Sequence, residues 1–182
     1  SASFATAGQQ APLEKSHLLV DILQKVASAT ATKKLGPTEL ASNKKIYGQL
    51  DQLIDFRKLT DGPVKPHKKS LSKKQVKTIK NLFKGAIRNI AYPKSGSFFR
   101  GAELTWGKPA ENGNQTDIPL DIFVEEEDLE VSLIFHWVQV GKTYKLFDLS
   151  IDDASLVKDY QNQFGKIIKE EGADTLVSKL KN

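Results

Sequence analysis

The spacing of apolar residues changes once along this chain, and that change limits the folds that the chain can form. Up to about Pro93, apolar side chains recur every three to four residues, as they do along one face of an α-helix. From about Phe98 they alternate with polar side chains, which is the period of a half-buried β-strand. Helices, then strands, then a closing helix predict an α+β fold with an antiparallel sheet.

Proline and capping residues indicate where the N-terminal helices begin and end. Pro12 is placed to open a helix, so residues 1–11 are expected to form a flexible N-terminus. Ser72 and Gln75 form a capping-box pattern that begins a later helix, and Pro93 is expected to end it. No repeat or low-complexity linker divides the remainder, so residues 12–182 are expected to form a single domain.

Two segments of the second half, Ile118–Val124 and Leu129–Trp137, alternate apolar with polar residues and predict strands with one apolar face. Gly141 and Lys142 turn the chain into a further strand, and turns this short join antiparallel strands. The acidic run Glu125–Asp128 is expected to be a solvated turn, because it lacks the spaced ligands and the glycine of a calcium-binding loop.

The basic residues of the chain are almost all lysines. The net charge is +5, and arginine occurs only at Arg57, Arg88 and Arg100, so 24 of the 27 basic residues are lysines. Lysine is a flexible point charge, whereas base reading and bidentate phosphate recognition favour arginine. This composition favours transient contact with an anionic membrane or an acidic partner and argues against nucleic-acid binding.

The sequence offers little catalytic chemistry. It contains no cysteine, its histidines His17, His67 and His136 are isolated, and it has no phosphate-binding loop or nucleophile elbow. We therefore expect no enzyme, no metal site and no cofactor; Asp148 is the single candidate if the chain were an enzyme with a buried carboxylate. No stretch approaches the length of a membrane-spanning helix, so we expect a soluble protein. A removed signal peptide or trimming would explain a start at Ser1 without methionine.

Several short motifs resemble the MlaC family, the periplasmic auxiliary proteins of phospholipid transport, which are also called toluene-tolerance proteins. The C-terminal motifs are Tyr144-Lys145-Leu146-Phe147-Asp148, then Asp152-Asp153-Ala154-Ser155-Leu156, then Tyr160-Gln161-Asn162-Gln163-Phe164. Upstream, Ile54-Asp55-Phe56, the run Leu71–Gln75 and the pair Leu82-Phe83 match in the same order. The chain departs from the family at Asp153, where members have glycine, and at 92–96, where members continue a helix.

The resemblance implies a curved antiparallel sheet wrapped by helices, like a nuclear transport factor 2-like cone with a helical lobe, and an apolar cavity between sheet and helices. It implies a periplasmic carrier that holds a phospholipid by its acyl chains and helps to maintain outer-membrane lipid asymmetry. The implied partners are an inner-membrane ABC transporter with MCE domains and an outer-membrane lipoprotein complex. A carrier of another hydrophobic molecule, such as a quinone or a sterol-like compound, stays open as an alternative.

We expect this single lipid-binding domain to line its cavity with apolar residues from the sheet and from the helices that face it. The candidates are Phe83, Ile87, Leu120, Ile122, Val131, Leu133, Phe135, Leu156 and Phe164. Each of them would belong to an ordinary core if the two faces packed without a gap. A lysine cluster around His67 is either a docking face for anionic headgroups or an acidic partner, or a solvated helix face. Its members are Lys65, Lys68, Lys69, Lys73, Lys74 and Lys77, followed by Lys80 and Lys84.

Overall fold

The computed structural model describes residues 7–182 and contains an α+β fold, as the change of period predicts. Its N-terminal helical elements are α1 (Ala7–Gln24), α2 (Pro37–Leu53), α3 (Phe56–Val64), the 3₁₀-helix η1 (Lys65–Ser70), α4 (Lys73–Ala86), the π-helix η2 (Ile87–Ala91) and α5 (Tyr92–Arg100). The strands are β1 (Glu103–Trp106), β2 (Ala110–Asn112), β3 (Gln115–Val124), β4 (Leu129–Val140), β5 (Thr143–Ile151) and β6 (Ala154–Ser155). The 3₁₀-helix η3 (Glu125–Glu127) joins β3 to β4, and α6 (Leu156–Glu171) and α7 (Ala173–Lys181) close the chain.

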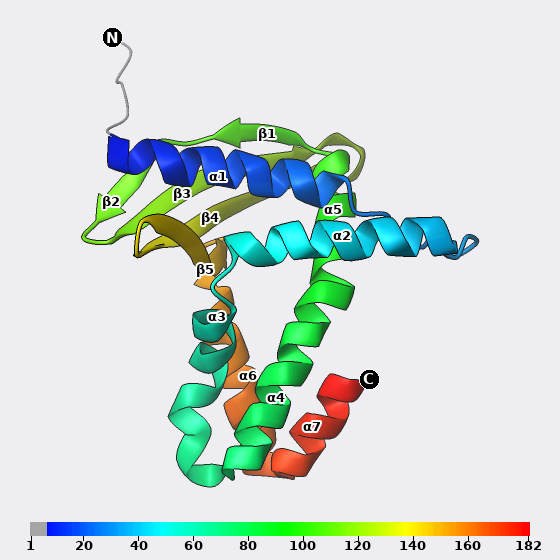
Figure 1. The fold of residues 1–182 in the computed structure, drawn as a ribbon, viewed down its shortest axis with the longest axis vertical. Coiled ribbons are helices and arrows are strands. Elements are labelled where there is room, and N and C mark those ends of the chain that lie inside the picture. Colours follow the sequence, from blue (N-terminus) through cyan, green and yellow to red (C-terminus); the bar gives the residue numbers. More distant parts are fainter. Residues whose placement is uncertain (1–6) are drawn as a thin grey trace.

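The strands form one antiparallel sheet in the order β1-β3-β4-β5-β6, with β2 also paired to β3. Leu120 of β3 lies opposite Leu133 of β4, and Ile122 lies opposite Val131, so these four side chains share one face. Helix α1 lies across the sheet, while α3, α4, α6 and α7 extend away from it as a helical lobe (Figure 1). A bulge between His136 and Trp137 interrupts the β4–β5 register, and bulges increase the local twist of a sheet.

Two apolar cores stabilise these two parts. The larger core joins α1, α2 and α5 to the sheet, and it contains Leu19, Leu23, Phe99, Leu120 and Trp137 among its buried residues. The smaller core holds the helical lobe together and consists of Val64, Ile79, Phe83, Phe164 and Leu176. Helix α4 begins with the expected capping box, in which Ser72 and Gln75 exchange side-chain and backbone hydrogen bonds.

Pro12 does not begin the first helix, because α1 starts at Ala7 and contains Pro12 in its interior. Residues 7–11, expected to be part of a flexible N-terminus, are therefore helical, and residues 1–6 lie outside the described part of the chain. Proline inside a helix removes one backbone hydrogen bond. Here Pro12 is fully buried, so the packing of its ring offsets this cost; separately, its carbonyl accepts a hydrogen bond from Ser16 Oγ at 2.8 Å.

Pro93 does not end the helix that begins at Lys73. The chain passes from α4 through the π-helix η2 into α5, with Pro93 in the first turn of α5. The wider π-turn, in which the Tyr92 N–H bonds to the Ile87 carbonyl, precedes the proline and gives its ring room beside the preceding turn. The strands consequently begin at Glu103 and not near Phe98, which lies in α5. Segment 92–96 is therefore helical, and the expectation that the chain departs from a continuing helix there is wrong.

The close approach of α5 to α1 depends on Gly96. A Cβ atom at this buried position would lie 2.1 Å from the Leu23 carbonyl oxygen, whereas a Cβ at Gly85 of α4 would meet nothing within 4 Å. We expect Gly96→Ala to destabilise the protein by about 1–3 kcal/mol, because the two helices would have to separate. The matched variant Gly85→Ala should stabilise it by about 0.5–1 kcal/mol. Urea unfolding followed by circular dichroism measures both, and an unchanged midpoint for Gly96→Ala would contradict this packing.

Candidate functional site

An apolar cavity of about 350 Å³ lies between the sheet and the helices. This volume is within the range of roughly 300–1,000 Å³ that is typical of small-molecule sites. Its wall is formed by Leu19, Leu23, Ile54, Leu59, Phe83, Ile87, Ala91, Tyr92, Ser95, Phe98, Phe99, Val131, Leu133, Phe135, Leu146, Asp148, Leu149, Ile151, Leu156, Val157 and Tyr160. All but a few of these side chains are hydrocarbon, so the interior suits an apolar ligand.

The cavity lies under the continuous helical segment α4–η2–α5, whose two ends pack on different helices. In the helical lobe, α4 packs on α6 and α7 through Phe83, whose ring meets the Phe164 ring edge to face at 5.5 Å. Beyond η2, α5 packs on α1. The turns between these two contacts carry Ile87, Ala91 and Ser95 along the cavity wall, opposite the apolar side chains of β4 and β5.

Among the residues of the wall, Ala91 and Ile151 are exposed to solvent, and Ile151 is 41% exposed. The first belongs to η2 and the second ends β5. Leu133 and Phe135 are 5% and 2% exposed, so they lie at the inner part of the wall. The mouth of the cavity therefore lies between η2 and the end of β5.

The carboxylate of Asp148 reaches the cavity wall, and both of its oxygens accept hydrogen bonds from neighbouring groups. Its Oδ1 accepts from the backbone N–H groups of Leu149 at 2.8 Å and Val157 at 3.1 Å, and its Oδ2 accepts from Ser155 Oγ. Ser155 in turn caps α6 by accepting from the Lys158 N–H. Asp148 thus fastens the end of β5 to the start of α6, which is a structural role.

Tyr92 presents its ring to the cavity and directs its hydroxyl away from it. The hydroxyl donates to Asp51 Oδ1 at 3.0 Å, and Arg88 forms an ion pair with the other oxygen of Asp51. Burial, helped by the neighbouring Asp51 carboxylate, raises the pKa of Tyr92, so its hydroxyl remains a neutral donor. The Tyr92 hydroxyl therefore finds its partner in Asp51, which is not a residue of the cavity wall.

The structure places six of the nine predicted lining residues on the cavity wall and three elsewhere. Phe83, Ile87, Val131, Leu133, Phe135 and Leu156 border the cavity, and some of them are also core residues. Leu120 and Ile122 of the larger core and Phe164 of the smaller core do not border it. Leu120 and Ile122 face the same way as Leu133, but they pack in the solid core that α1 closes. The prediction missed Leu19, Leu23, Tyr92, Phe99 and Tyr160, although the apolar stripe of α1 already contained the first two.

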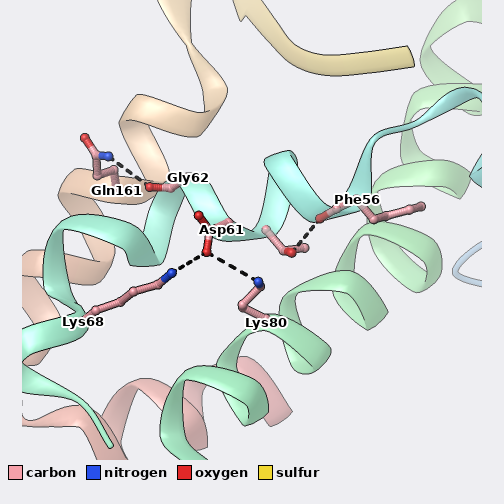
Figure 2. Close-up of polar contacts among 7 residues, drawn as sticks. Phe56, Asp61, Gly62, Lys68, Lys80 and Gln161 are labelled. Atoms are coloured by element: carbon pink, nitrogen blue, oxygen red, sulfur yellow. Dashed lines mark hydrogen bonds and ion pairs between the residues drawn. The ribbon is translucent and has the colours of Figure 1, made fainter. Parts of the chain in front are cut away.

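The predicted lysine docking face is exposed on η1 and the start of α4, but Lys68 is paired, as is the half-buried Lys80 that follows it. Lys68 bonds to Asp61 of α3 at 2.8 Å, and Lys80 approaches the same oxygen at 3.5 Å (Figure 2). The hydrogen bond from Lys68 lowers the pKa of Asp61. Within the described residues, no ion pair engages the other members, which are Lys65, Lys69, Lys73, Lys74 and Lys77. Nearby, Gln161 of α6 donates to the Gly62 carbonyl and holds α3 on α6 (Figure 2).

Other binding chemistry is sparse in the part of the chain that the structure describes. Within residues 7–182, no group of three His, Cys, Asp or Glu side chains could hold a metal ion. In the same residues, no helix combines the length and apolarity needed to cross a membrane. The acidic run Glu125–Asp128 forms the exposed turn that its composition predicted, and Asp128 and Asp153 adopt left-handed backbone conformations, which aspartate tolerates better than most residues.

Comparisons with known proteins agree with this geometry. Residues 20–182 match the family model described as MlaC protein. Among solved structures, a phospholipid-binding protein from Ralstonia solanacearum, determined in complex with a phospholipid, is similar with a TM-score of 0.64 and 16% sequence identity. That similarity covers 96% of this chain and 99% of the other, and at this identity it shows a shared fold. The search of the curated proteins found no match.

The contrast between core and cavity wall can be tested on one cross-strand pair. Leu120 and Leu133 are direct partners on the same sheet face and both belong to the larger core, but only Leu133 also lines the cavity. Leu120→Ala should destabilise the ligand-free protein by about 2–5 kcal/mol, as in other packed cores. Leu133→Ala should cost clearly less, because its neighbours already border empty space. Urea unfolding of delipidated samples gives both values, and equal losses would place Leu133 in ordinary core.

Proposed function

This chain belongs to the MlaC family, and we propose that it is a lipid carrier that takes up a phospholipid by its acyl chains in the cavity between sheet and helices. The observation that carries the proposal is the almost wholly apolar wall, which opens to solvent beside Ala91 and Ile151. The Ralstonia solanacearum protein of the same fold was solved with a phospholipid bound, which supports this ligand class. The occupied hydrogen bonds of Asp148 favour a carrier over an enzyme.

The energetics of lipid transfer explain why such a cavity is needed. At about 0.8 kcal/mol for each buried CH₂ group, two sixteen-carbon chains gain on the order of 25 kcal/mol in a bilayer. A carrier can remove such a lipid only if its own cavity offers a comparable apolar environment. The exchange is then close to neutral in free energy, so its direction must be set by another protein.

We propose that this carrier works in the periplasm between two membrane complexes. The MlaC family implies an inner-membrane ABC transporter with MCE domains, which supplies the energy, and an outer-membrane lipoprotein complex at the other side. The five unpaired lysines of η1 and α4 would serve these encounters, because lysine side chains attract anionic surfaces without fixed geometry.

The carrier function predicts that the purified protein contains diacyl phospholipid and takes it up from vesicles. Leu133→Trp should fill the cavity, so that the variant folds but retains several-fold less phospholipid than the unchanged protein. Native mass spectrometry and lipid extraction measure the content, and melting is recorded on delipidated samples because bound ligand raises apparent stability. Extraction of a quinone or sterol-like compound in place of phospholipid would identify a carrier of another class.

The control for this experiment is a tryptophan on the same sheet away from the cavity. Val140→Trp changes an exposed residue of β4 that is absent from the wall, and it should leave lipid content unchanged. If Leu133→Trp kept its full lipid content, Leu133 would not border the acyl chains.

The docking role of the lysines predicts salt-sensitive transfer. Charge reversal at Lys69, Lys73 and Lys77 should slow lipid transfer to anionic vesicles or to an acidic partner while leaving bound lipid in place. Transfer by the unchanged protein should weaken as ionic strength rises, since exposed charges are screened over roughly 8 Å at physiological salt. The matched control reverses Lys34, Lys44 and Lys45, which are exposed in and before α2. Equal transfer rates for the two triple variants would show that these lysines form an ordinary solvated helix face and not a docking face.

A further inference from the structure

The cavity is too small to hold two acyl chains at once. Its volume is about 350 Å³. A protein cavity of about 150 Å³ holds one benzene molecule, so by proportion this cavity holds about 14 carbon atoms. That is roughly one sixteen-carbon chain, and a diacyl phospholipid brings about twice as many carbons. A second chain therefore enters only if the helical wall and the sheet move apart.

The helical wall of the cavity is held from behind by one carboxylate. Asp51 lies in the last turn of α2, and its Oδ1 accepts a hydrogen bond from the Tyr92 hydroxyl at 3.0 Å. Its Oδ2 forms an ion pair with Arg88 of η2. Tyr92 is buried and the other two residues are half-buried, so water has limited access to these bonds. We call Asp51, Arg88 and Tyr92 the latch.

The end of α2 that carries Asp51 is itself fixed to β5, which belongs to the opposite wall. The Gln52 carbonyl accepts a hydrogen bond from Lys145 Nζ at 2.8 Å. The Asp55 N–H donates to the Leu146 carbonyl at 2.8 Å, and Leu146 lines the cavity. The latch thus connects the helical wall to the sheet through α2. Outward movement of that wall has to break the latch or detach α2 from β5.

The latch is built to open at a moderate cost. Arg88 Nε is buried, and among residues 7–182 it has no hydrogen-bond partner, so the ion pair leaves part of the guanidinium unsatisfied. Asp51 stands near the C-terminal end of a helix, where the helix dipole disfavours a carboxylate. Release lets both charges regain hydration, which offsets part of the lost attraction. The π-turn η2 contains Arg88, and helices bend readily at such turns.

We propose that the latch determines how many acyl chains the cavity admits: closed, it admits one chain, and its release lets the wall bend away at η2 and admit a second; this inference rests on the proposed carrier function. Asp51 and Arg88 do not border the cavity, and Tyr92 contributes its ring to the wall while its hydroxyl serves the latch. The three residues therefore discriminate between single-chain and diacyl lipids through the position of the wall.

The experiment compares two lipids that share a headgroup and chain length and differ in chain number. The delipidated full chain is mixed with vesicles of dipalmitoyl phosphatidylcholine, or with palmitoyl lysophosphatidylcholine below its micelle concentration. Native mass spectrometry follows the bound lipid with time. The rate of each variant is divided by the rate of the unchanged protein with the same lipid, so the different solubilities of the two lipids cancel.

Two variants weaken the latch to different extents. Tyr92→Phe removes one hydrogen bond and keeps the ring on the wall, and Asp51→Asn removes the ion pair. One hydrogen bond corresponds to roughly 2- to 10-fold in rate, so we expect Tyr92→Phe to accelerate diacyl uptake by that factor and Asp51→Asn to accelerate it more. Binding of the first single-chain molecule should keep its rate in both variants, because the closed cavity already accepts it.

The matched control is Glu171→Gln, which breaks the exposed ion pair of Glu171 with Lys179 outside the cavity wall and should change neither rate. Melting curves of the delipidated variants verify that each is folded. Equal acceleration of both lipids would reveal a general loosening of the fold and overturn the inference. Diacyl uptake that neither latch variant accelerates would overturn it too. Failure of the unchanged protein to bind either lipid would instead overturn the carrier function itself.

Discussion

The helices cover the apolar face of the sheet by direct packing only in part, and the cavity lies where this packing is incomplete. Around β3 the residues Leu120 and Ile122 lie in the solid core with α1. Over β4 and β5 the cover is the continuous segment α4–η2–α5. Its α5 end packs on α1, and its α4 end packs on α6 and α7. Side chains around an empty apolar space lack dispersion contacts, which lowers the stability of the ligand-free protein. A hydrophobic ligand in the cavity can restore these contacts.

Periodicity predicted the fold class and the facing of side chains, but it could not predict what covers them. A period of two places Leu120 and Leu133 on one face, and their register makes them neighbours. Their different surroundings depend on the paths of α1 and α4, which no local pattern in β3 or β4 encodes. The same limit applies to α6, where Leu156 lines the cavity and Phe164, two turns later on one apolar stripe, belongs to the smaller core.

The prolines show a second limit of local rules. Pro12 and Pro93 each disfavour a helix through the missing N–H and the ring, and both nevertheless lie within one. At Pro12 burial compensates, and at Pro93 a π-turn provides space. Both solutions depend on contacts with distant residues or on a change of hydrogen-bond pattern upstream. By contrast, the helix start at Ser72 was predicted correctly because a helix cap is decided by residues within the same few positions.

The separation of charge along the molecule bears on how a carrier can exchange its ligand. The free lysines lie at η1 and the start of α4, whereas the exposed Asp152 and Asp153 directly follow Ile151 at the mouth. From Lys73 to Ala91 the helical path covers about 27 Å, since each residue contributes about 1.5 Å. That distance exceeds the screening length of roughly 8 Å at physiological salt several times, so the two charged regions act independently. A partner held by the helical lobe therefore leaves the electrostatic environment of the mouth unchanged, and on the proposed function the contact that recruits the carrier and the contact that receives its lipid can be made by different surfaces.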